Sequence, residues 1–162
     1  MEQNINDIVK VYLAQTDSAI KISSIVSEHS NRNEVNGDDI ICGLVYRLMV
    51  PMAQEEIQQS LNAADKILND ELSNSEGEED EEEYDTIEET YEIPTVSRKI
   101  KSNQCNCDIC SQVRICLCNY KEYEPQDQLA TIFKNSIQET CNKYNIYIWL
   151  SIKVFCNFID NK

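Results

Sequence analysis

The stretch that decides the fold is residues 28–48, "EHSNRNEVNGDDIICGLVYRL", which joins a long amphipathic segment to a short one. Before it, apolar residues recur at three- and four-residue intervals, a spacing that predicts one long helix of about seven turns. The Asn and Gly residues of "NRNEVNG" (31–37) are typical of a turn. Asp38 or Asp39 can then cap a second, shorter helix by accepting hydrogen bonds from its first amide groups.

The helical pattern continues to about residue 69. Val50-Pro51 interrupts the second helix, because proline disfavours helical geometry at the residue before it. The run "MAQEEIQQSLNAADKIL" (52–68) then predicts a third helix. The long helix carries apolar residues on more than one face, so we expect it to cross a second helix of like kind in an intertwined dimer. Residues 1–69 are therefore predicted to form a helical domain.

The acidic charge of the chain is concentrated in one block. The formal net charge is −15, and residues 70–92 contain thirteen acidic residues and no basic one. Residues 93–162 carry a net charge of +3 by the same count. A block of this kind cannot bury enough apolar surface to offset the entropy of ordering, so it is predicted to be a disordered linker. Its charge leaves open a basic protein as partner, or competition for the basic side chains that follow it.

Five of the eight cysteines lie close together in "CNCDICSQVRICLC" (105–118). The first residues do not resemble a secretory signal peptide, so metal-bound thiolates in a reducing, intracellular compartment fit better than disulfides. A CxxC turn lets two sulfurs bind one zinc ion at about 2.3 Å. Free or redox-labile cysteines are the alternative. The preferred zinc ligands are Cys107, Cys110, Cys116 and Cys118, with Cys105 as a competing ligand.

Residues 93–162 are accordingly predicted to form a zinc-stabilised α(+β) module. An apolar stripe predicts a helix from about residue 127 to residue 144. The tail, 146–162, fits either a strand or a buried helix, and its apolar run is too short to span a membrane and contains Lys153. Candidate contacts to nucleic acid are basic side chains near the cysteines, namely Arg98, Lys99, Lys101 and Arg114.

The opening stretch resembles the histone fold, closest to the two core histones of the central tetramer and to archaeal histones. In that family the end of the median helix, the second loop and the third helix read H-x-x-R-x-x-V-x-x-x-D-[VI]-x-x-A-L. The resemblance covers about residues 5–50. Without a gap, the same register here holds His29, Arg32, Val35, Asp39, Ile40, Gly43 and Leu44.

This resemblance implies roles for five of these residues. Arg32 and Asp39 would form the ion pair between loop and helix, although the two would also fit a plain helix-capping arrangement. Val35 would lie in a short strand that pairs with the partner's first loop. Ile40 and Leu44 would enter a core shared by the two chains. Dimerisation with itself or with another histone-fold protein is therefore expected.

The stretch also departs from the family pattern. The long helix begins almost at Met1, so the expected histone fold is a truncated one. Glu34 stands in the loop that holds phosphate in histones, and its carboxylate would repel a phosphate group. Gly43 replaces the usual Ala, which costs the helix up to about 1 kcal/mol. We interpret His29 as a hydrogen-bonded histidine near a helix end rather than as a ligand.

The sequence therefore predicts a mainly α, non-enzymatic protein. It contains no evident nucleophile–base pair and no phosphate-binding glycine loop. The first functional hypothesis is a histone-like chain that pairs in chromatin or transcription, with DNA binding left open. The alternative is a small zinc-binding adaptor or regulatory protein whose N-terminal helices form a generic hairpin. An AT-rich-looking composition, a histone-like domain and a compact Cys module together suggest a large DNA virus or an AT-rich microbial eukaryote, so we expect the nucleus, a viral factory or a virion.

Overall fold

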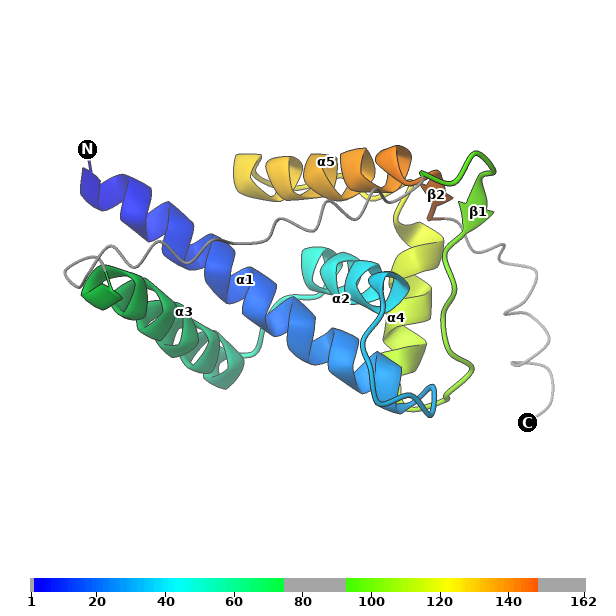
Figure 1. Cartoon of the computed structure of the whole chain (residues 1–162), viewed down its shortest axis with the longest axis horizontal. Coiled ribbons are helices and arrows are strands. Elements are labelled where there is room, and N and C mark those ends of the chain that lie inside the picture. Colours follow the sequence, from blue (N-terminus) through cyan, green and yellow to red (C-terminus); the bar gives the residue numbers. More distant parts are fainter. Residues whose placement is uncertain (1, 75–92, 149–162) are drawn as a thin grey trace, which may run out of the picture.

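The computed structural model describes residues 2–74 and 93–148, and these are mainly helical (Figure 1), as predicted. None of the helices in this part of the chain is long and apolar enough to cross a membrane. The elements in chain order are α1 (Glu2–Glu28), α2 (Gly37–Met49), α3 (Gln54–Asn74), β1 (Arg98–Lys99), α4 (Asp108–Asn119), α5 (Gln128–Lys143) and β2 (Ile146–Tyr147).

The structure differs from the sequence-based predictions in three places. Residues 70–74 belong to α3, while the rest of the predicted linker, 75–92, lies outside the described residues. The tail begins with the short strand β2, which pairs in parallel with β1, and residues 149–162 also lie outside the described part. Helix α4, which starts directly after Cys107, was not predicted from the sequence.

Helix α1 lies between α2 and α3, which pack against different sides of it (Figure 1). The backbones of α1 and α2 come into unusually close contact at Gly43. A Cβ atom at that position would lie 2.2 Å from the Ala19 carbonyl oxygen and 2.3 Å from Ser23 Oγ. Only glycine fits there, so the close packing of the two helices offsets its low helix propensity.

The turn before α2 is fixed by the side chains of Arg32, Asn36 and Asp39. Asn36, rather than Asp38 or Asp39, is the N-cap, and its side chain accepts a hydrogen bond from the Asp39 amide. The Asp39 carboxylate accepts from the Asn36 amide in return, which completes a capping box. Arg32 donates to both Asp39 oxygens at 2.6 and 2.8 Å, so the predicted ion pair is confirmed.

The first residues of the Cys-rich segment attach to the same end of α2. Arg98 donates to both carboxylate oxygens of Asp38, at 2.7 and 2.9 Å, and the Lys101 amide donates to Asp38 as well. Asp38 is only 6% exposed, so the two acids at the start of α2 are both buried and both paired with arginine. The two chain segments therefore meet at one helix N-terminus.

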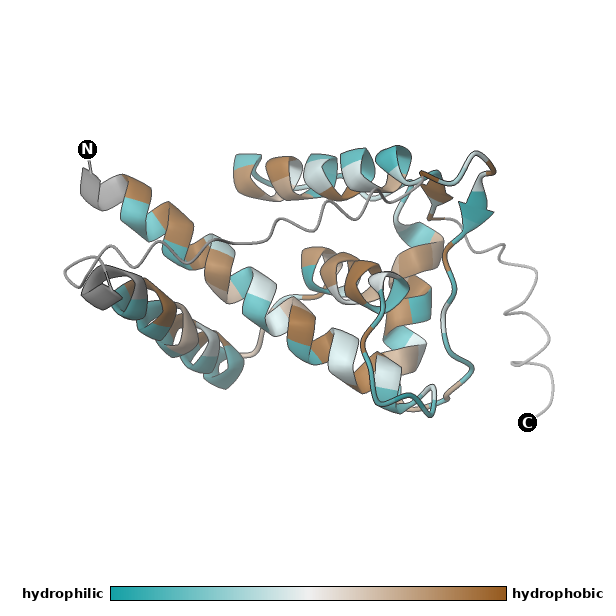
Figure 2. Cartoon of the chain, viewed as in Figure 1, coloured by the Kyte–Doolittle hydropathy of each residue, from teal (hydrophilic) through white to brown (hydrophobic). Residues whose placement is uncertain are grey.

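Side chains from both segments share one buried core. Helix α2 packs against α4 and α5, and Figure 2 shows apolar residues concentrated on α2 and α4. The described parts of the two predicted domains, 1–69 and 93–162, thus pack around common apolar side chains. Among them are three cysteines and six larger residues, Cys42, Cys116, Cys141, Val26, Val45, Val113, Leu117, Tyr120 and Phe133.

Candidate metal centre

A histidine and three cysteines from distant parts of the chain meet at one surface site. His29, Cys105, Cys107 and Cys110 each place one ligand atom within 4.8 Å of the others. The Nδ1 atom of His29 lies 3.5 Å from the Cys105 sulfur, 3.2 Å from the Cys107 sulfur and 3.4 Å from the Cys110 sulfur. In a tetrahedral zinc site, Zn–N bonds of about 2.0 Å and Zn–S bonds of about 2.3 Å separate nitrogen and sulfur by about 3.5 Å. The observed spacing matches this value.

His29 reaches the cluster because α1 ends next to it. The His29 amide still bonds in helical fashion to the Ile25 carbonyl, but the next amide, of Ser30, turns to the Ser27 carbonyl. Asn31 then adopts a φ of 55°, a left-handed conformation that asparagine tolerates and that ends a helix. The imidazole therefore projects from the last turn of α1 as an exposed side chain.

The CxxC pair lies at the N-terminus of α4. Cys107 is the N-cap, and its sulfur accepts a hydrogen bond from the Cys110 amide at 3.4 Å. Cys110 sits in the first turn, so both sulfurs lie where unpaired amides and the helix dipole stabilise negative charge. The bond from the Cys110 backbone amide is the main cause that lowers the pKa of Cys107 to about 7. Burial raises the pKa of Cys110 to about 11 in the absence of metal.

Cys116 and Cys118 do not join this group, although the sequence analysis preferred them as ligands. Both lie toward the C-terminal end of α4, and a rise of about 1.5 Å per residue carries Cys116 about 9 Å along the helix from Cys110. The Cys116 side chain is 2% exposed and belongs to the apolar core. Cys105, which was expected only to compete, contributes a sulfur from the extended segment before α4.

The candidate ligand that was not predicted from the sequence is His29. It was interpreted as a hydrogen-bonded histidine at a helix end, and it does lie at the end of α1. The signal that could have found it is the crowding of three thiols within six residues, 105–110, which leaves one position of a tetrahedral ion to a distant donor.

The four basic residues expected to contact nucleic acid lie in different surroundings. The guanidinium of Arg98 is bound to Asp38, and that of Arg114 donates to the Asn103 and Cys105 carbonyls. Lys99 lies in β1 and Lys101 lies two residues after it, and both residues are exposed. The two arginines thus hold the Cys-rich segment in place, and nucleic-acid contact stays a prediction.

The residues expected at a dimer interface are only partly covered within one chain. Val35 is 40% exposed and Ile40 is 43% exposed, whereas Leu44 is partly buried against the core. Ile5 and Ile8, in the first turns of α1, are each more than half exposed. Apolar surface therefore remains on α1 and at the start of α2.

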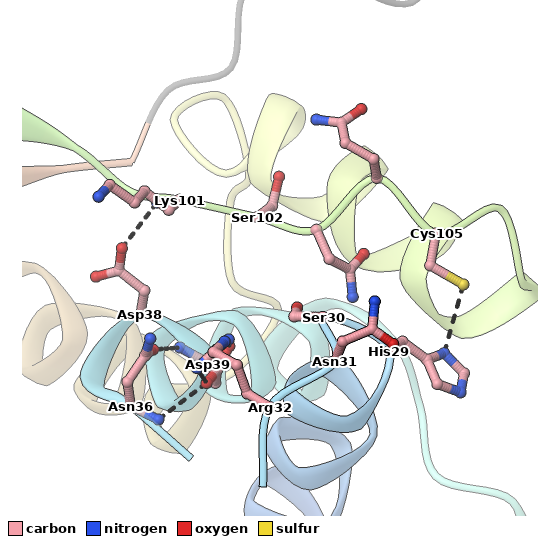
Figure 3. Close-up of a pocket in the computed structure, with 12 residues that line it drawn as sticks. His29, Ser30, Asn31, Arg32, Asn36, Asp38, Asp39, Lys101, Ser102 and Cys105 are labelled. Atoms are coloured by element: carbon pink, nitrogen blue, oxygen red, sulfur yellow. Dashed lines mark hydrogen bonds and ion pairs between the residues drawn. The ribbon is translucent and has the colours of Figure 1, made fainter. Parts of the chain in front are cut away.

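A polar pocket of about 430 Å³ opens beside the cluster. Figure 3 shows His29 and Cys105 together on one side of it, and the Arg32–Asp39 and Asp38–Lys101 contacts on the other. Both carboxylates of the pocket are engaged by arginine, and the candidate metal ligands beside it are the histidine and the thiols of the cluster.

The fold and the site together define a helical protein with a candidate Cys₃His metal centre. No known protein family, curated protein or solved structure matches the chain. The function is therefore argued from the geometry of the site.

Proposed function

We propose that this is a non-enzymatic binding protein whose two segments are locked together by a structural zinc ion. The ligands would be His29, Cys105, Cys107 and Cys110, and the observation that carries the proposal is their nitrogen–sulfur spacing of 3.2–3.5 Å. Thiolate and imidazole donors favour zinc, whereas magnesium and calcium prefer oxygen ligands.

A structural role fits this ligand set better than a catalytic one. Four protein donors complete a tetrahedral shell, while catalytic zinc keeps a position for water or substrate. The ion would join the end of α1 to the start of α4, across 76 to 81 residues of chain. Closing so long a loop restricts the unfolded chain, so the zinc ion would stabilise the contact between the two segments.

The experiment is metal analysis of the full chain purified without chelator. We expect about one zinc ion per chain by mass spectrometry of the bound metal. Removal of that ion by a chelator should lower the midpoint temperature of unfolding, and adding zinc back should restore it. A chain that takes up no zinc, or whose unfolding temperature does not respond to zinc, would contradict the proposal.

A second proposal, pairing through a histone-like surface, is favoured by a separate observation. The bidentate Arg32–Asp39 ion pair stands in the register of the histone motif, beside the exposed side chains of Val35 and Ile40. The partner would be a second copy or another histone-fold chain, in chromatin or transcription. Any DNA contact would fall to Lys99 and Lys101 rather than to the loop with Glu34.

Light scattering coupled to size-exclusion chromatography tests the pairing, on the full chain alone and mixed with histone-fold proteins. Ile40→Lys should abolish any complex, because it places a charge on the proposed contact. Ile67→Lys is the matched control, since Ile67 on α3 is 43% exposed like Ile40. A monomer in every mixture, or equal effects of the two substitutions, would overturn this proposal.

A further inference from the structure

Asn103 stands between the two elements that carry the candidate ligands. Its side-chain nitrogen lies 3.1 Å from the sulfur of Cys110 and 3.1 Å from the carbonyl oxygen of Val26. An amide NH₂ group has two hydrogens, so it can donate to both acceptors at once. One side chain thereby links a sulfur at the start of α4 to the backbone at the end of α1.

The Val26 carbonyl is available because of the way in which α1 ends. The Ser30 amide bonds to the Ser27 carbonyl, so it does not donate to Val26 in helical fashion. The Val26 oxygen accepts instead from the Ser30 hydroxyl at 2.7 Å and from Asn103. Asn103 thus satisfies a carbonyl in the last turn of the helix from which His29 projects.

The backbone around Asn103 is held from the other side by Arg114. This guanidinium, on α4, donates to the Asn103 carbonyl at 3.0 Å and to the Cys105 carbonyl at 2.6 Å. It also reaches the Ser111 hydroxyl at 3.3 Å. Because both carbonyls are bound to α4, the segment cannot shift without breaking charge-assisted hydrogen bonds. The Asn103 amide is therefore presented to Cys110 by a fixed backbone.

We propose that Asn103 is a positioning residue of the metal centre, which orients the Cys110 sulfur toward the ion and keeps it in register with His29. This inference rests on the proposed zinc function. Hydrogen bonds to metal ligands from residues outside the coordination shell fix ligand orientation, and their loss commonly costs 10–100-fold in metal affinity. A donor is required here, since a carboxylate at the same position would face the thiolate with a second negative charge.

Asn103→Asp is the decisive variant because it replaces the NH₂ donor by a carboxylate oxygen with almost no change in side-chain shape. We expect the full chain with this substitution to bind zinc about 10–100-fold more weakly in competition with a chromophoric chelator. With cobalt in place of zinc, the thiolate-to-cobalt absorption should shift, since the geometry at Cys110 changes. Asn69→Asp is the matched control, as it adds the same charge on the exposed face of α3. It should leave both readouts unchanged.

The outcomes separate the two proposals. If the wild-type chain binds neither zinc nor cobalt, the zinc function itself fails. If the wild-type chain binds both and Asn103→Asp binds with equal affinity and an unchanged cobalt spectrum, the role of Asn103 is overturned while the metal centre stands. Should Asn103→Asp not fold, Asn103→Ala removes the donor without adding charge. The inference would likewise be overturned if Asn103→Ala binds zinc with unchanged affinity and its unfolding temperature falls by the same amount with and without zinc.

Discussion

Two groups of cysteines in this protein lie in different environments. Cys105, Cys107 and Cys110 gather with a histidine at a helix N-terminus near the surface. Cys116 and Cys141 are almost fully buried among apolar side chains of α4 and α5. Each sulfur of the first group accepts a hydrogen bond at 3.1–3.5 Å, whereas in the second group, among the described residues, only Cys116 has a donor, the Gln112 amide at 3.9 Å. Position on the helix, rather than closeness in sequence, separates candidate ligands from core residues.

The pKa of Cys107 separates it from the core thiols, whereas burial raises the pKa of Cys110, a member of the first group, to about 11 as well. The Cys110 amide lowers the pKa of Cys107 to about 7, whereas burial raises the pKa of Cys141 to about 11. Burial raises the pKa of Cys42 still further above its ordinary value. A buried neutral thiol behaves as a small apolar side chain, so these residues should contribute packing and no metal binding.

The substitutions Cys110→Ala and Cys116→Ala should show the largest difference between the two groups of cysteines. Cys110→Ala removes a proposed ligand, so zinc affinity should fall by at least about 100-fold, and metal analysis should find little zinc after gel filtration. Cys116→Ala should keep one zinc ion per chain and lower the free energy of unfolding by about 1–2 kcal/mol through lost core packing. Loss of zinc in the Cys116→Ala variant would show that Cys116 is a metal ligand and not only a core residue.

Gly43→Ala should damage the core side of the molecule and spare the metal side. The added methyl group would overlap the Ala19 carbonyl, so α1 and α2 must move apart at a cost of about 1–3 kcal/mol. Chemical denaturation should show the same loss with zinc and with chelator, because the contact lies away from the ligands. Gly37→Ala is the control, since a Cβ there meets nothing within 4 Å. An equal loss in both variants would contradict the packing explanation, because alanine raises helix propensity at both positions.

The sequence predicted the elements that have a local signal. The three-and-four spacing of apolar residues predicted α1, and an apolar stripe predicted α5, whose N-cap is Asp127, almost to the residue. The Arg32–Asp39 pair was predicted from residues seven apart in a motif and is present. In each of these cases the controlling interaction lies within a few residues or turns of chain.

What the sequence did not predict depends on tertiary packing. Helix α4 was missed because its first turn is built from a CxxC pair, which was interpreted as a zinc-binding turn. Without a helix between them, Cys116 was predicted to share an ion with Cys110. His29 lies 76 residues before Cys105, so no spacing rule could bring the two together. The contact exists because α2 packs on α4 and carries the end of α1 with it.

The smallest expected effect is kinetic and concerns thiol reactivity in the metal-free protein. Iodoacetamide reacts with the thiolate, so Cys107, with a pKa of about 7, should react near pH 7 faster than Cys141, whose pKa is about 11. Protonation should slow the Cys107 reaction by roughly 50-fold between pH 7 and pH 5, whereas the rate should level off above about pH 8. Peptide mass spectrometry after timed quenching measures both sites in one sample.

Zinc provides the control for this labelling experiment. A bound ion would occupy the Cys107 sulfur and slow its alkylation, while Cys141 should react at the same rate with or without metal. If zinc slows both sites equally, the ion protects by tightening the whole fold, and the reactivity difference reports burial alone. If zinc slows neither, the low pKa of Cys107 arises from the helix N-terminus without any metal function. Only selective protection of Cys107 supports two chemically distinct groups of cysteines.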